Sequence, residues 1–249
     1  MDYYFEDFTE ERYVDVLRCL KKVGWKFLSY PAYRDNKNAL LLRHDVDVSV
    51  CRALRMAELE HLEGVCSTYC FLLHSSFYNL LDKDIVKKVK TIAGYGHHIG
   101  LHFYPGWYDI QYHKMQYDSL VHKLCIEKKI LEELFECSIE MFSFHNPEEG
   151  DFIHCEEDEI GDMVNCYGKY FKQNYDYISD SNGYWRFERL LDFLARNHNA
   201  AQILLHPVWW TPYAMSPFSR IKYCVNNYSD YLLSEYEKIL EAAGRINVK

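Results

Sequence analysis

The chain has 249 residues, of which 49% are hydrophobic, and its formal net charge is −9 at pH 7. Such a surface repels a phosphate backbone, so the composition argues against a nucleic-acid-binding protein. No segment approaches the ~20 consecutive apolar residues that a membrane-spanning helix needs. The first residues are acidic and no apolar segment follows them, so we expect no signal peptide and a cytoplasmic location. Nine cysteines without a CxxC pair indicate reduced thiols.

Regular elements are predicted along the whole chain. A helix capped by Thr9 is expected to end at about Val23, before Gly24. Strands are predicted over 39–43, 66–73, 97–104, 139–144, 163–167, 175–179 and 201–205. Helices are predicted over 50–62 (after the cap Ser49), 82–92, 114–135, 188–197 and 230–243.

Alternation of strands and helices indicates a parallel sheet with right-handed crossovers, hence an α/β fold. Six or seven strands fit a TIM-like barrel or an open doubly wound sheet. No linker rich in Pro, Gly or Ser divides the chain, so we expect a single domain over 1–249, with a helical extension at 1–37 and the barrel at 38–249. Nucleotide-binding glycine motifs are absent from the sequence.

Ionisable side chains gather where the predicted strands end. The carboxyl ends of parallel strands meet at one mouth, so this pattern predicts an active site. The strand ends in question carry Arg43 to Asp47, His102, His145 with Asn146, Asp180 with Ser181, and His206.

Asp45 and Asp47 stand two residues apart, so they face the same side of a strand. Two close carboxylates repel each other unless a metal or a shared proton lies between them. The pair therefore predicts a metal-assisted site. The alternative is a pair of capping acids ahead of the helix that begins at Ser49.

Histidines supply the other candidate groups. We interpret His102 as a metal ligand, since neutral imidazole binds zinc, and His97 as structural. His145 is a third ligand, a substrate contact or a structural residue. His206 is a proton donor to a leaving group or a structural residue.

Aromatic residues are also common near these strand ends. Flat rings with polar tips suit sugar rings, so the grouping indicates a carbohydrate ligand. The residues are Tyr104, Trp107, Trp209, Trp210 and Tyr213.

Together these segments resemble the polysaccharide deacetylase family, also called the NodB-homology or carbohydrate esterase 4 family. The similarity is closest to its intracellular branch, which is associated with bacterial surface-polysaccharide gene clusters. The matching segments occur in family order and are 43–47, 64–71, 96–102, 142–147 and 204–207. The resemblance implies a distorted (β/α)7 barrel and metal-dependent amide hydrolysis.

The resemblance also implies roles for individual residues. Asp45 matches the general base, His206 matches the proton donor, and Asp47 and His102 match metal ligands, with Zn²⁺ as the first expectation for the metal. We expect His145 as the third ligand, because Gly106 stands where the family has its second histidine. Substrate contacts are expected from Arg43, Asn146, Asp180, Trp209, Trp210 and Tyr104.

The expected function is N-deacetylation of a nucleotide- or lipid-linked N-acetylated sugar, a precursor of a surface polysaccharide or lipopolysaccharide. Two alternatives stay open. One is a catalytically degenerate barrel that binds carbohydrate or scaffolds a biosynthetic complex, which the glycine at 106 motivates. The other is a metal hydrolase for a different amide or ester, since fold does not fix substrate.

Overall fold

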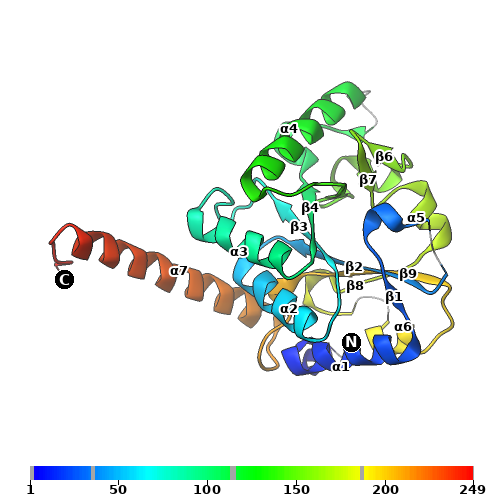
Figure 1. Cartoon of the computed structure of the whole chain (residues 1–249), viewed down its shortest axis with the longest axis horizontal. Helices are drawn as coiled ribbons and strands as arrows, with labels where there is room; N and C mark the ends of the chain where they lie inside the picture. Colours follow the sequence, from blue (N-terminus) through cyan, green and yellow to red (C-terminus); the bar gives the residue numbers. More distant parts are fainter. Residues whose placement is uncertain (1–2, 35–36, 113–115, 186–187, 249) are drawn as a thin grey trace.

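The computed structural model describes residues 3–34, 37–112, 116–185 and 188–248, and its centre is one curved sheet surrounded by helices (Figure 1). The strand order is β6-β7-β5-β4-β3-β2-β9-β8, and β1 pairs with the start of β2. The strands are β1 (Lys26–Phe27), β2 (Ala39–Val46), β3 (Thr68–Leu72), β4 (His98–Phe103), β5 (Met141–Phe144), β6 (Glu159–Ile160), β7 (Met163–Asn165), β8 (Asp176–Ser179) and β9 (Ala200–Leu205).

Strand order shows that the chain winds round in one direction. From β2 it proceeds through β3, β4 and β5 to β7, and then continues with β8 and β9, which lie on the other side of β2. Every pairing along this path is parallel, whereas β6 pairs antiparallel to β7. No strand pairing joins β7 or β6 to β8 among the described residues, so the sheet is a barrel open on one side. The predicted distorted (β/α)7 barrel with an N-terminal helix is therefore confirmed, and the doubly wound alternative is wrong.

Strand β2 is the centre of this sheet. All eight of its residues are buried, and it pairs with β9 along Ala39–His44 and with β3 along Arg43–Val46. Apolar side chains such as Leu40 and Leu42 suit a strand covered on both faces. The region 1–37, expected to be helical, also contributes β1 to this sheet.

Three early helices begin where the sequence predicts. Thr9 Oγ1 accepts a hydrogen bond from the Arg12 amide at 3.2 Å, Ser49 caps the second helix, and Asp82 caps the third. Gly24 ends the first helix with a φ of 94°, a left-handed conformation that glycine adopts without strain. The helices are α1 (Glu10–Val23), α2 (Val50–Leu62), α3 (Lys83–Gly94), α4 (Tyr117–Phe135), α5 (Lys169–Asn174), α6 (Leu190–Leu194) and α7 (Pro217–Ala242).

The later helices differ from their predicted bounds. Helix α7 begins at Pro217, well before the predicted start at Asp230, because Ser216 caps it and proline suits the first helical position. Helix α6 is shorter than 188–197, and the predicted start of α4 at Lys114 lies outside the described residues. No helix in the described ranges is long and apolar enough to cross a membrane.

A buried carboxylate holds the N-terminal helices against the sheet. Glu60 of α2 accepts hydrogen bonds from the Tyr69 hydroxyl at 2.8 Å and the Ser67 hydroxyl at 2.6 Å, and it also bonds the Tyr13 hydroxyl. His44 Nε2 lies 2.7 Å from the same carboxylate. Burial raises the pKa of Glu60, but the histidines and these donors outweigh it and lower the pKa to about 2. His97 belongs to this layer, with Nε2 2.9 Å from the Ala57 carbonyl, which matches its predicted structural role.

Candidate active site

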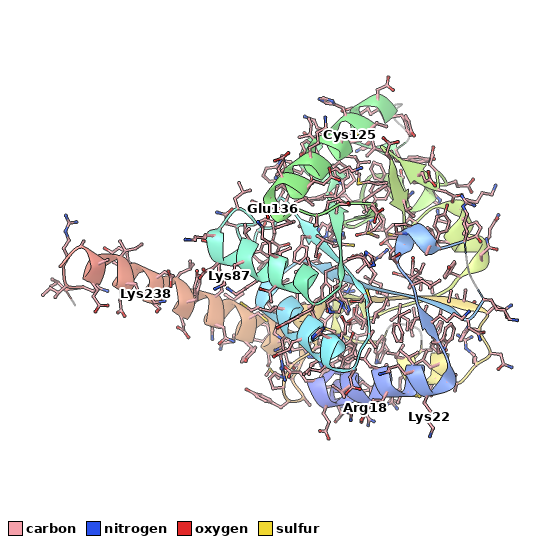
Figure 2. The ribbon with its side chains drawn as sticks, in the orientation of Figure 1. Arg18, Lys22, Lys87, Cys125, Glu136 and Lys238 are labelled. Atoms are coloured by element: carbon pink, nitrogen blue, oxygen red, sulfur yellow. The ribbon has the colours of Figure 1, made fainter. Side chains whose placement is uncertain are left out.

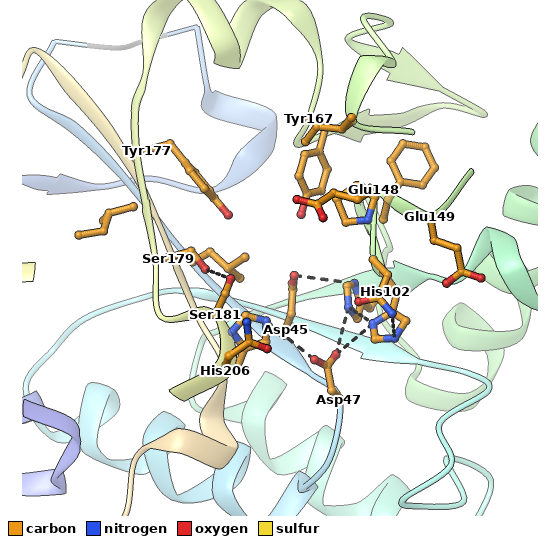
Figure 3. A pocket seen from close by; sticks show the side chains of 18 of the residues that line it. Asp45, Asp47, His102, Glu148, Glu149, Tyr167, Tyr177, Ser179, Ser181 and His206 are labelled. Atoms are coloured by element: carbon orange, nitrogen blue, oxygen red, sulfur yellow. Dashed lines mark hydrogen bonds and ion pairs between the residues drawn. The ribbon is translucent and has the colours of Figure 1, made fainter. Parts of the chain in front are cut away.

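The carboxyl ends of the strands surround a cavity of about 740 Å³ (Figure 3). It extends from the ends of β2, β4 and β5 to β8 and the segment after β7, on the two sides of the opening in the barrel. The wall includes predicted site residues and several further side chains: Asp45, Asp47, His102, His145, Asn146, Glu148, Glu149, Tyr167, Tyr177, Ser179, Ser181, Glu188, His206 and Trp209. The cavity therefore lies where the sequence predicted that the strand ends would meet.

Asp47, His102 and His145 form a candidate metal-binding cluster at one side of the cavity. The Asp47 carboxylate oxygen Oδ1 lies 3.1 Å from His102 Nε2 and 3.5 Å from His145 Nδ1, and the two ring nitrogens are 3.1 Å apart. All three ligand atoms lie within 4.8 Å of one another. Two imidazole nitrogens and one carboxylate oxygen are a donor set that suits zinc and other divalent metals.

Two features show that this cluster suits a cation. Asp47 Oδ1 is buried yet makes no hydrogen bond of good geometry. Burial raises the pKa of Asp47, but the His102 and His145 rings outweigh it and hold that pKa well below its usual range. His102 Nδ1 lies 2.7 Å from the Ser143 hydroxyl, which leaves Nε2 directed at the cluster. Because the Ser143 hydroxyl donates its hydrogen to Asp45, it accepts a hydrogen bond from Nδ1 of His102. This tautomer leaves Nε2 without a hydrogen, as a metal ligand requires.

Asp45 lies beside the cluster and deeper in the barrel. Its Oδ1 accepts a hydrogen bond from the Ser143 hydroxyl at 3.1 Å and lies 3.2 Å from the Arg43 guanidinium Nε. The side chain of Arg43 is 0% exposed, and it also contacts the Cys166 thiol and the Tyr167 hydroxyl. Arg43 was predicted to bind substrate, but unlike Asp45 it does not line the cavity, and its guanidinium holds Asp45 instead.

His206 follows β9, the strand next to β2, and its Nε2 lies 3.8 Å from Asp47 Oδ2. Its Nδ1 lies 2.6 Å from Asp180, which also accepts a hydrogen bond from the Trp210 indole at 2.9 Å. Burial lowers the pKa of His206, but the Asp180 carboxylate outweighs it and raises that pKa to about 9. Asp180 and Trp210 were predicted to bind substrate, but both are 0% exposed, and they position His206 instead.

The remaining predicted substrate contacts differ in position. Asn146 and Trp209 line the cavity, and Asn146 Nδ2 lies 3.2 Å from His145 Nε2. Tyr104 packs its ring edge-on against His145, with 5.0 Å between ring centroids, and donates a hydrogen bond to Glu149. Tyr104 is therefore a support for His145.

Gly106 is closely surrounded by two side chains. A Cβ atom at this position would lie 2.6 Å from Tyr104 Cε2 and 2.7 Å from Glu149 Oε1. Those two side chains fill the space that a histidine at 106 would need. The third side chain of the candidate cluster is His145, directly after β5.

Several residues in or next to the cavity were not predicted. Ser143 does not line the cavity, but it bridges Asp45 and His102, which do. The hydroxyl groups of Tyr167 and Tyr177 point into the cavity (Figure 3). Tyr177 precedes Ser179 by two residues on β8, so strand parity could have identified it. No comparable signal marks Tyr167, which follows β7.

Comparison with known proteins gives likenesses of fold. No family model and no curated protein matches the sequence. Among solved structures, the fold is similar to a CE4-family pseudoenzyme from Bacillus anthracis, with 13% identity, a TM-score of 0.45, and coverage of 79% of this chain and 62% of that one. It is also similar to a family 4 carbohydrate esterase from Bacillus anthracis (14% identity, 92% and 93% coverage, TM-score 0.42) and to the Streptococcus pyogenes deacetylase PplD in complex with acetate (14%, 84% and 84%, 0.45).

The chain spans less than two thirds of the length of the pseudoenzyme it resembles. At such low sequence identity these matches are similarities of fold alone, and they say nothing about the chemistry of the site.

Proposed function

We propose that this protein is a metal-dependent N-deacetylase that hydrolyses the amide of an N-acetylated sugar. The observation that supports this most directly is the position of Asp45 and His206 beside the Asp47, His102 and His145 cluster. A buried carboxylate and a histidine with a raised pKa are the base and the acid that amide hydrolysis requires.

A divalent metal at the cluster, which we propose is Zn²⁺, would polarise the amide carbonyl and lower the pKa of a nearby water. Asp45, oriented by Arg43 and Ser143, removes a proton from that water as its oxygen attacks the carbonyl carbon. The C–N bond then breaks and His206 gives its proton to the departing nitrogen. Asp180 keeps His206 protonated and oriented until that step. The products are acetate and a free amine.

The cavity wall suits a sugar. The hydroxyls of Tyr167, Tyr177 and Ser181 are partners for sugar hydroxyls, and the Trp209 ring is an apolar surface for a ring face. Glu148, Glu149 and Glu188 make the described wall acidic, so it repels phosphate. For a nucleotide- or lipid-linked precursor of a surface polysaccharide in the cytoplasm, we propose that the sugar enters the cavity while the phosphates stay outside.

A second candidate is a non-catalytic barrel that binds carbohydrate or scaffolds a complex. It rests on Gly106, where Tyr104 and Glu149 fill the space of a further histidine. The two candidates differ in whether the cluster holds a metal strongly enough for turnover.

The test combines metal analysis with acetate release from N-acetylhexosamine conjugates. We expect about one divalent metal per chain, lost in Asp47→Ala and His145→Ala and kept in His98→Ala, a control on the exposed start of β4. Asp45→Asn should keep the metal and lose acetate release. Metal binding without turnover on any conjugate would favour the second candidate, and absence of both would refute the deacetylase.

A further inference from the structure

Glu127 interrupts the apolar face of helix α4. The helix packs against β4, and its course can be followed in Figure 2 from Cys125 to Glu136, the residue after its end. A carboxylate that is 1% exposed is costly to bury. Core packing therefore does not account for Glu127. The buried residues of α4 recur at the spacing of one helix face and are Leu120, Leu124, Glu127, Leu131 and Phe135.

In the described ranges, two side chains bond this carboxylate, and they come from two different loops. Tyr108, in the turn after β4, donates its hydroxyl to Glu127 Oε1 at 2.8 Å. His74, in the loop after β3, has its Nε2 3.0 Å from the same hydroxyl and 3.4 Å from Glu127 Oε1. Because Tyr108 gives its hydrogen to Glu127, His74 Nε2 donates to the Tyr108 oxygen. Glu127 thus fastens both loops to α4.

The loop after β3 holds the backbone that carries Asp47. Ser75, next to His74, donates its hydroxyl to the Asp47 carbonyl at 2.9 Å. The Tyr78 hydroxyl donates to the Val46 carbonyl at 2.6 Å. The position of this loop therefore fixes the chain at the end of β2, where the first side chain of the candidate metal-binding cluster stands.

The turn after β4 supports His145. Tyr104 precedes this turn, and its ring lies edge-on against the His145 ring. The Trp107 amide donates to the Tyr104 carbonyl at 3.2 Å, so hydrogen-bonded backbone connects Tyr104 to Tyr108. The Trp107 ring also stacks on His74, with 4.4 Å between ring centroids, which joins the two loops directly. Both supports of the cluster are thus attached to α4 at one carboxylate.

We propose that Glu127 is a positioning residue for the candidate metal-binding cluster, because it holds the two loops that set the separation of Asp47 and His145. This positioning role rests on the proposed function, whose metal site it concerns. Glu127 does not line the cavity, so it touches neither metal nor substrate. A metal binds most strongly where its ligands are already held at the required separation. Releasing the loops should therefore weaken metal binding although every ligand is still present.

A double variant tests this role without opening a cavity. In Glu127→Leu/Tyr108→Phe both hydrogen-bonding partners become apolar groups of similar size, which should leave stability nearly unchanged. Burial raises the pKa of Glu127 to about 7, so removing this acid should keep or raise the melting temperature at pH 8. We expect Zn²⁺ affinity, measured by titration calorimetry on metal-free protein, to fall roughly tenfold. A purely structural residue would not separate affinity from melting temperature.

Three further comparisons serve as controls. Glu127→Gln keeps an oxygen that accepts from Tyr108, so it should retain most of the Zn²⁺ affinity. Glu133→Leu makes the same exchange on the exposed side of α4 and should leave the affinity unchanged. Glu127→Leu and Tyr108→Phe alone should each weaken Zn²⁺ binding, and the double variant should be no weaker than the weaker of the two, because both break one connection.

The possible failures are distinguishable. Equal Zn²⁺ affinities in the wild-type chain and the double variant would overturn the positioning role alone and leave the proposed function intact. A fall in affinity accompanied by an equally clear fall in melting temperature would also overturn it, since loss of the folded state would then explain both. A wild-type chain that binds no Zn²⁺ and releases no acetate would refute the proposed function and the positioning role together.

Discussion

Ser143 connects Asp45 and His102 through one hydroxyl. It donates to Asp45 at 3.1 Å and lies 2.7 Å from His102 Nδ1, so it orients the proposed base and one proposed ligand together. A hydroxyl serves both because it is a donor and an acceptor at once.

Replacing Ser143 should therefore weaken metal binding without touching a ligand. For Ser143→Ala we expect metal affinity to fall by roughly 10–100-fold, as is typical when a partner that orients a ligating histidine is lost. Titration calorimetry on metal-free protein measures this. Ser179→Ala is the control, because Ser179 is a serine of the cavity wall that bonds Ser181 and neither Asp45 nor His102. Equal affinities in the two variants would show that Ser143 does not orient His102.

Glu60 should make stability depend on pH in the acid range. Its pKa falls from 4.5 in the unfolded chain to about 2 in the folded one, where His44, His97, Tyr13, Tyr69 and Ser67 surround it. A lowered carboxylate pKa contributes stability that is present above pH 4.5 and is lost as pH falls through about 2.

At pH 7 we expect Glu60→Gln to lower the free energy of unfolding by about 3 kcal/mol, with the difference shrinking between pH 4.5 and 2. Urea denaturation across this range measures it. Glu58→Gln on the same helix is a surface control and should change stability by less than about 1 kcal/mol. A Glu60→Gln effect that stays constant with pH would contradict the assignment.

Sequence reasoning at this scale found which residues face the mouth but not how deep each one lies. Arg43, Asp45 and Asp47 alternate along β2 and the residue that follows it, so they face the same side. Their side chains are nevertheless exposed to different degrees, at 0%, 2% and 24%. Depth decides whether a side chain meets substrate or supports another residue, and alternation alone does not contain it. The same limit applies to Asp180 and Trp210, whose partner is His206.

Strands β3, β4 and β5 approach each other closely at Gly100. A Cβ there would lie 2.4 Å from Met141 Sδ and 2.8 Å from Cys70 Sγ. We expect Gly100→Ala to lower the free energy of unfolding by about 1–3 kcal/mol through overpacking. Thermal denaturation of Gly100→Ala and Gly94→Ala tests this. Gly94 ends α3 with no atom near its Cβ position, so its replacement should be neutral or slightly stabilising. Equal melting temperatures would contradict the predicted overpacking.

Helices and strands could be predicted where capping residues and the apolar pattern of the sequence agree. Thr9, Gly24 and Ser49 are capping residues at helix ends, and the apolar run of β2 is long enough to identify a buried strand. The start of α7 was missed because the first half of that helix has few aliphatic residues. Its anchors are Arg220, Cys224 and Tyr231, which an apolar repeat does not reveal.

Across the whole molecule, local stability should follow position in the open sheet. Strand β2 is paired on both sides, whereas β8 pairs only with β9 in the described structure and β6 pairs only with β7. We expect amide hydrogens of β2 to exchange at the rate of global unfolding and those of β8 and β6 to exchange faster. Hydrogen-exchange mass spectrometry measures this. Protection of β8 equal to that of β2 would indicate a closed barrel.

The buried guanidinium of Arg43 has a consequence for the order of folding. It contacts Asp45 on one side and Cys166 and Tyr167 on the other. Cys166 and Tyr167 lie 123 and 124 residues after Arg43 in the chain. Contacts of such long sequence separation form late, because the intervening chain must first be brought together. During synthesis, a nascent chain that ends before Cys166 therefore lacks part of the arrangement that holds Asp45. The proposed activity should appear only after β9, which precedes His206, has joined the sheet, and partly folded chains should be inert.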